Sequence, residues 1–148
     1  MECLTDVRIV VIRRMLLYKR RFFWRRTLGT IGERLTATLY SWLWFTIIER
    51  NWRCSTGEID LLAVRARKLH LIEVKTKVVR GNRYGAIDQI TEQKVRRLRR
   101  LLRRYCISNG AILRQRRIAS YQIDYVGIEI FLTPLPRMRI TRQLLGRL

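Results

Sequence analysis

The 148-residue sequence contains one histidine, three cysteines and two prolines. Cys3, Cys54 and Cys106 form no C-x-x-C pair, so neither a disulfide framework nor a thiolate zinc site is indicated, and a reducing cytoplasm is the expected location. The single histidine, His70, excludes nucleases built on pairs of histidines. The longest mostly apolar stretch, residues 35–48, is shorter than the roughly 18 residues of a transmembrane span, so none is expected.

Acidic residues are scarce: 11 Asp and Glu oppose 32 Lys and Arg, for a net charge of +21. Residues 1–28 carry +6, residues 29–93 only +3, and residues 94–148 carry +12. A nearly balanced centre between basic ends suits a polyanion, with phosphates on the flanks and chemistry in the middle. Nucleic acid, DNA more than RNA, is therefore the expected partner, and no small-molecule cofactor is expected. A membrane-facing surface or a generally basic proteome is the alternative.

The order of periodic segments predicts an α/β protein. Helical spacing occurs over 31–44 and 87–105, whereas β-branched and aromatic runs at 45–52, 59–64, 69–76 and 118–132 predict strands. The resulting α-β-β-β-α-β order predicts a mixed sheet flanked by helices. We expect one domain over 29–133, a basic extension over 1–28 and a basic tail over 134–148. Trp42, Trp44 and Trp52 are expected in the core.

The most informative pattern is a pair of short motifs, Gly57-Glu58-Ile59-Asp60 and Glu73-Val74-Lys75. With a hairpin tip at 65–68, Asp60 falls opposite Glu73 with Cβ atoms about 5 Å apart, and Lys75 shares the face of Glu73. Facing carboxylates repel unless a cation lies between them, which predicts that Asp60 and Glu73 bind Mg²⁺ or Mn²⁺.

Three further side chains bear on that predicted site. Lys75 would orient a water molecule or neutralise phosphate, and Glu33 would complete the metal site from the first helix. Glu58 would either support the site or pair with Lys75. The alternatives without catalysis are a solvent-exposed salt bridge between Glu73 and Lys75 and, for Glu33, a carboxylate that only stabilises the helix N-terminus.

Seven of the eleven residues from 94 to 104 are Lys or Arg. Phosphates would relieve their mutual repulsion, although a solvated outer helix face is the alternative. The predicted nucleic-acid contacts are Lys77, Lys94, Arg97, Arg100 and Arg104. Gln89 is expected near the passing backbone, and Asp124 either supports the site or takes a turn or edge role.

Taken together, Gly32-Glu33, Asn51, Gly57 to Leu62, Ile72 to Lys77 and Lys94 closely resemble the YraN-type family of bacterial proteins. That family looks like a branch of the PD-(D/E)XK nuclease superfamily, whose restriction-endonuclease-like fold also occurs in archaeal Holliday-junction resolvases. The resemblance covers about residues 29–126. It departs at Trp44, where the family usually has glycine, and at the arginine-rich hairpin tip.

By this resemblance, Asp60, Glu73 and Lys75 match the superfamily's acid and D/E-x-K positions, Glu33 matches the helix glutamate of resolvase-like members, and Asp124 matches a late-strand aspartate. The resemblance implies a metal-dependent endonuclease acting on DNA, with branched or damaged DNA among the candidate substrates. Junction-resolving relatives are dimers, so a homodimer is compatible with it. A non-catalytic nucleic-acid binder is the alternative, and an accessory protein anchored at a membrane or ribosome through residues 7–28 is a third.

Overall fold

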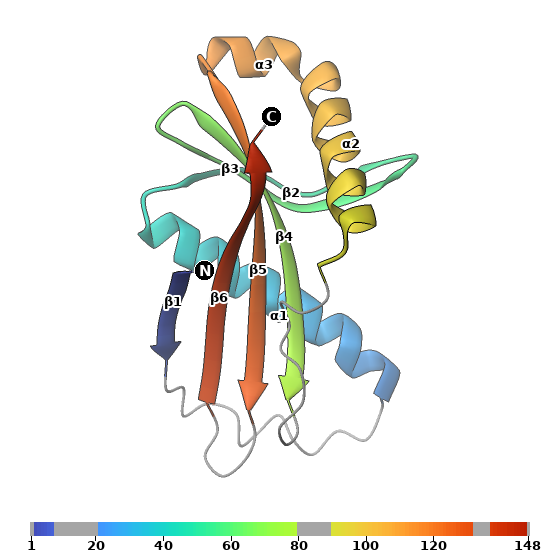
Figure 1. Cartoon of the computed structure of the whole chain (residues 1–148), viewed down its shortest axis with the longest axis vertical. Helices are drawn as coiled ribbons and strands as arrows, with labels where there is room; N and C mark the ends of the chain where they lie inside the picture. The colour runs from blue at the N-terminus through green and yellow to red at the C-terminus, as the bar shows by residue number, and fades with distance from the viewer. Residues whose placement is uncertain (1, 8–20, 80–89, 132–136, 148) are drawn as a thin grey trace.

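The computed structural model describes residues 2–7, 21–79, 90–131 and 137–147. Within these ranges the elements are β1 (Glu2–Val7), α1 (Arg21–Trp42), β2 (Thr46–Cys54), β3 (Gly57–Arg65), β4 (Lys68–Val79), α2 (Glu92–Ser108), α3 (Gly110–Gln115), β5 (Ser120–Phe131) and β6 (Arg137–Arg147). The strands form one mixed sheet in the order β1-β6-β5-β4-β3-β2. The predicted α-β-β-β-α-β core, which has a restriction-endonuclease-like arrangement, is confirmed (Figure 1).

One strand pair in this sheet is parallel. The strands β2, β3 and β4 form an antiparallel meander, and β5 then lies parallel to β4. A parallel pair needs a long crossover connection, and the segment that carries α2 and α3 provides it. Strand β6 returns antiparallel to β5, and β1 adds to its outer side.

Helices cover both faces of the sheet (Figure 1). One apolar cluster joins α1 to one face, where Tyr40 packs with Leu61 and Ile72. The other cluster joins α2 to the opposite face, where Leu62 and Leu71 pack with residues of the helix. Successive residues of a strand point to opposite faces, so a sheet covered on both sides has the nearly continuous apolar runs seen in β3 and β4.

The turn between β3 and β4 lies where the sequence predicts it. Ala66 and Arg67 both have left-handed backbone angles, with φ of 48° and 60°. Two such residues in a row form a type I′ turn, whose twist matches that of the flanking strands. The register that follows pairs Arg65 with Lys68 and continues without a bulge to Leu61 and Ile72.

Several expectations from the sequence are wrong. Residues 137–147 form β6 within the sheet rather than a tail, and Glu2–Val7 of the predicted extension forms β1. Helix α1 begins at Arg21, well before the predicted start at 31. Trp42 and Trp44 are exposed, at 77% and 85%, because the helix ends with both outside the core. No described helix is both long and apolar enough to span a membrane.

Candidate functional site

The register of the sheet brings the predicted acids together. The β3–β4 ladder ends with Leu61 paired to Ile72, and continuing its register by one position sets Asp60 opposite Glu73. Glu73 in turn pairs with Tyr125 of β5, and Tyr125 with Gln143 of β6. On the other side, the rungs that flank Asp60 place Asn51 of β2 next to it. Five strands therefore contribute one residue each to a single row.

Asp60 is the most perturbed acid of this row. Its Oδ2 accepts a hydrogen bond of 2.7 Å from the Val74 backbone N–H, which favours the charged form. Burial opposes that effect and, together with the negative charge of Glu73, raises the pKa of the Asp60 carboxyl from 3.8 to about 7. Glu33 and Glu58 add smaller contributions in the same direction. At neutral pH the carboxyl is thus poised between its two protonation states, as groups at functional sites often are.

Helix α2 brings a positive charge to this row. The Thr91 side chain accepts from the Lys94 backbone N–H and caps the helix at its N-terminus. Lys94 Nζ lies 2.9 Å from Glu73 Oε1 and 4.8 Å from the centre of the Tyr125 ring. Burial, then Glu73 and Asp60, raise the pKa of Tyr125 to about 12, so its hydroxyl stays protonated at neutral pH.

Glu33 reaches the same neighbourhood from α1. Its side chain hydrogen-bonds to Asn51, which lowers its pKa, but burial has the larger effect and the net direction is upward. Asn51 has a left-handed backbone, with φ of 51°, a conformation that asparagine tolerates better than most residues. Glu33 therefore belongs to the same electrostatic group as Asp60.

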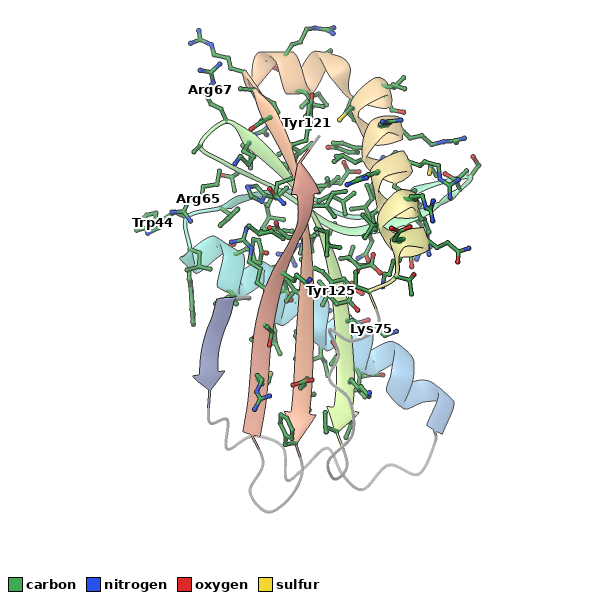
Figure 2. The ribbon with its side chains drawn as sticks, in the orientation of Figure 1. Trp44, Arg65, Arg67, Lys75, Tyr121 and Tyr125 are labelled. Carbon is green, nitrogen blue, oxygen red and sulfur yellow. The ribbon has the colours of Figure 1, made fainter. Side chains whose placement is uncertain are left out.

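Lys75 is exposed and lies two residues beyond Glu73 on the same face of β4 (Figure 2). It forms no ion pair with any residue in the described ranges. The predicted Glu58–Lys75 pair is not formed, because Glu58 Oε2 instead lies 3.2 Å from Arg53 Nε on the neighbouring strand β2. Lys75 thus presents an exposed side chain beside the row.

The protein offers this site two adjacent carboxylates rather than a full cage. Among the residues that the structure describes, no three His, Cys, Asp or Glu side chains form a metal-binding cluster. Mg²⁺ commonly binds through one or two carboxylates and fills its remaining positions with water or substrate phosphate. The pair formed by Asp60 and Glu73 fits that mode, because a bound cation would offset the repulsion that raises the pKa of Asp60.

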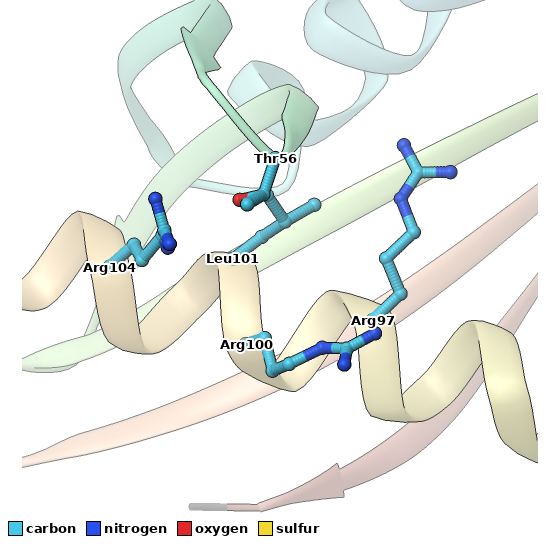
Figure 3. Close-up of a pocket in the computed structure, with 5 residues that line it drawn as sticks. All are labelled: Thr56, Arg97, Arg100, Leu101 and Arg104. Carbon is cyan, nitrogen blue, oxygen red and sulfur yellow. The ribbon is translucent and has the colours of Figure 1, made fainter.

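A basic hollow lies beyond the row, between α2 and the turn that joins β2 to β3 (Figure 3). It has a volume of about 430 Å³ and is lined by Thr56, Arg97, Arg100, Leu101 and Arg104. Arg104 Nη1 donates to Ser55 Oγ at 3.0 Å, which ties the helix to the turn. Gly57, in the same turn, has a φ of 144° that favours glycine, and a Cβ there would lie 3.1 Å from Arg97 Nη2. Three of the predicted nucleic-acid contacts therefore line one hollow.

Asp124 lies elsewhere. It sits mid-strand in β5 and is fully buried on the α1 face, so the predicted turn or edge role is wrong. Its Oδ2 accepts from Arg142 Nη2 at 2.7 Å and from the Tyr40 hydroxyl at 3.1 Å, and His70 Nδ1 lies 3.0 Å away. Neighbouring strand residues face opposite ways, so Asp124 points away from the row that contains Tyr125.

Sequence reasoning overlooked Asn51 and Tyr125 as members of the site. The sequence analysis names Asn51 only as part of the family pattern, and Tyr125 could have been found only by assuming the parallel register of β4 and β5. Gln89, predicted near the substrate, lies outside the described residues. Lys77 follows Lys75 along the same face of β4, where its side chain is half-buried.

Comparison with known proteins gives the chain a family. Residues 32–128 match the model described as "Uncharacterised protein family UPF0102". The chain belongs to this family. A UPF0102 protein of Mycobacterium sp. (strain JLS) is 38% identical over 108 residues, which cover 72% of this chain and 76% of that relative. One from Mycobacterium tuberculosis (strain ATCC 25177 / H37Ra) is 37% identical over 109 residues, covering 72% and 80%.

The family match spans most of the candidate site. Residues 32–128 include Glu33, every member of the row up to Tyr125, and the arginines of α2. The match leaves out strands β1 and β6 and the first turns of α1. The row positions from Asn51 to Tyr125 therefore fall within the matched region, whereas Gln143 of β6 lies beyond it.

Proposed function

We propose that this protein is a metal-dependent nuclease that hydrolyses phosphodiester bonds in DNA, and that it represents a YraN-type branch of the PD-(D/E)XK superfamily. The observation that carries the proposal is the electrostatic state of Asp60. Burial and the negative charge of Glu73 raise the pKa of this half-buried carboxyl to about 7, an arrangement that destabilises the protein unless a cation offsets it. Proteins keep such arrangements mainly at functional sites.

In this proposal each residue has a defined role. Asp60 and Glu73 hold Mg²⁺ or Mn²⁺ from two rigid strands, and Glu33 adds negative charge from α1. When bound, the cation supplies positive charge to the scissile phosphate and lowers the pKa of an attacking water. Lys75 donates from its exposed ammonium to that water or to a phosphate oxygen. Lys94 holds the Glu73 carboxylate in place through the 2.9 Å contact between its Nζ and Glu73 Oε1.

The charge of α2 supports a polyanionic substrate. Arg97, Arg100 and Arg104 line a hollow beside the row, and the sequence has no acid between Glu92 and Asp124. Phosphates that enter this hollow would continue toward Asp60 and Glu73, with Lys77 on the same face of β4 as a further contact. Arginine-rich surfaces of this kind bind the nucleic-acid backbone without regard to sequence. Duplex, branched and damaged DNA are thus all candidate substrates.

One observation favours a second candidate, a nucleic-acid binder without nuclease activity. The Lys94 ammonium already contacts the Glu73 carboxylate, and a lysine in that position neutralises part of the charge that would hold a metal. In that case the fold and the arginines of α2 would bind DNA, and the row would serve only stability. The two candidates make opposite predictions for cutting but the same prediction for binding.

Purified protein would be incubated with linear duplex, single-stranded and four-way-junction DNA, and with matched RNA, in Mg²⁺, in Mn²⁺ and in chelator. The nuclease proposal requires cutting that needs metal and is lost in Asp60→Asn and Glu73→Gln variants that still bind. Glu92→Gln is the matched control, because Glu92 is an exposed acid of α2 paired with Arg96. Binding without cutting in every metal would instead establish the second candidate.

A further inference from the structure

A second aromatic and basic surface lies away from the carboxylates, where α1 ends. Trp42 and Trp44 are 77% and 85% exposed, so neither ring contributes substantially to the core. Monomeric proteins seldom leave two neighbouring tryptophans this open without a partner for them. The side chains of Trp44 and Arg65 both project outward at one edge of the molecule (Figure 2).

The backbone at Trp44 shows that the fold does not need this side chain. The Phe45 N–H donates to the Tyr40 carbonyl and the Trp44 N–H to the Ser41 carbonyl, and together these form a Schellman motif. Its left-handed position, usually glycine, is Trp44 with φ of 65°. The apolar contact typical of the motif is made by Phe45 on Tyr40, with ring centres 4.7 Å apart. Trp44 therefore occupies a strained position and gives the helix end nothing that glycine would not.

Basic side chains lie along the same edge of the molecule, with Arg65 next to Trp44 and Arg67 farther along the hairpin (Figure 2). The Arg65 guanidinium lies 5.2 Å from the centre of the Phe45 ring, next to Trp44 in the chain. Arg67, at the tip of the β3–β4 hairpin, donates from Nε to the Arg117 carbonyl at 2.9 Å, which ties Arg117 to the hairpin tip. None of these arginines forms an ion pair within the described residues. The sequence has no acid between Asp60 and Glu73, so the hairpin tip is purely basic.

We propose that Trp42, Trp44, Arg65 and Arg67, here called the tryptophan surface, bind unpaired nucleotides of a nucleic acid. Exposed aromatic rings stack on bases of any sequence, and adjacent arginines contact the phosphates and stack as well. Duplex bases are already stacked, so the surface selects single-stranded segments such as ends, gaps and loops. This binding does not depend on whether the carboxylate row cuts, and it is measured in chelator.

A nucleic acid fits this surface better than a lipid bilayer does. Anchoring in a bilayer needs apolar side chains that insert together, and the exposed large aliphatic side chains of the described residues lie elsewhere, on α2, α3 and β6: Ile107, Ile112 and Leu144. A second copy of this chain would bring the same arginines, so equal charges would face each other unless the two surfaces were offset. Stacking rings beside unpaired guanidiniums instead complement a flexible polyanion.

The deciding variant is Trp44→Gly, because glycine relieves the left-handed backbone and leaves the helix cap intact. Binding of labelled oligothymidylate of about 16 nucleotides would be measured in chelator, alongside binding of a blunt DNA duplex. We expect the variant to lose affinity for the oligothymidylate by about fivefold to a hundredfold. Its affinity for the duplex should stay the same and its melting temperature should not fall. Leu144→Ala, which trims another exposed apolar side chain, is the matched control.

Further readouts complete the test. Tryptophan fluorescence of the wild-type protein should be quenched by the oligothymidylate, and Trp44→Gly should show less quenching. An Arg65→Gln/Arg67→Gln variant should lose affinity for the same probe, more steeply at low salt. Unchanged oligothymidylate affinity in Trp44→Gly would overturn the proposal. The proposal would also be overturned if Trp44→Gly lost only its binding to anionic phosphatidylserine vesicles. The same holds if the variant lost only self-association, measured by ultracentrifugation.

Discussion

Replacing Asp60 with asparagine removes one negative charge from the carboxylate row, and we expect the metal-free protein to become more stable at pH 8. The asparagine side-chain oxygen can still accept from the Val74 N–H, and its amide can donate toward Glu73. The variant therefore keeps the local hydrogen bonding while it loses the repulsion. Most substitutions destabilise a protein, so a gain at a buried polar position would be a distinctive result.

The magnitude follows from the two pKa values of Asp60. The carboxyl has a pKa of about 7 in the folded protein and an ordinary value of 3.8. Between these values the folded state binds more protons than the unfolded state, so stability falls as pH rises through that window. Each pH unit corresponds to about 1.4 kcal/mol, which sets an upper limit of about 4 kcal/mol at pH 8. Burying the asparagine amide also costs free energy, so we expect a net gain in stability of about 2 kcal/mol.

Thermal unfolding in chelator at pH 4 and pH 8 measures this effect. For a chain of this size, a gain of about 2 kcal/mol raises the melting temperature by about 6 °C. At pH 4 the aspartic acid is largely neutral, so variant and wild type should melt within about 2 °C of each other. Added Mg²⁺ or Mn²⁺ should stabilise the wild type at pH 8 and have little effect on the variant.

The control is Glu92→Gln, which removes the same charge from an exposed position on α2. It measures how much stability changes simply because one negative charge is removed from a protein with a net charge of +21. If Asp60→Asn is no more stable than this control at pH 8, or if its gain is equal at pH 4, then Asp60 is not the strained carboxyl that we describe. The proposed metal site would lose its main support.

Three more predictions concern catalysis, packing and DNA binding. Lys75→Ala should slow cutting by about 100-fold or more while duplex affinity changes by less than about tenfold, and equal loss of both would refute its assigned role. Gly32→Ala should lower the free energy of unfolding by about 1–3 kcal/mol in denaturant titrations, because its Cβ would collide with Thr76 Oγ1. An unchanged free energy of unfolding would show that β4 shifts to make room for the Cβ at little cost. A double Arg97→Gln/Arg100→Gln variant should reduce the slope of log affinity against log salt by about 2, and an unchanged slope would mean that neither contacts phosphate.

Local patterns predicted the hairpin and its chemistry because the information lies within a few residues. The two-residue turn at Ala66 and Arg67 fixes the register, and the register sets Asp60 opposite Glu73. Strand β6 was missed because its alternation of Arg137, Met138, Arg139 and Ile140 is outweighed by charge, yet the pattern has the two-residue period of a strand.

Other features depend on residues far apart in the chain. Asp124 is buried because Tyr40, His70 and Arg142 converge on it from α1, β4 and β6, and no local pattern distinguishes such an aspartate from one in a turn. Trp44 was expected in the core because tryptophan usually is buried there, but its place in the helix cap overrides that preference.

The type I′ turn between β3 and β4 lies far from the carboxylates along the hairpin, yet it controls whether they face each other. One extra residue at the tip would shift one strand by a single position and rotate its alternate side chains to the wrong side of the sheet. Asp60 would then point toward the layer of α1 while Glu73 stayed under α2. Surface-loop insertions are usually tolerated, but here a lengthened tip would separate the two carboxylates at a distance, through geometry alone.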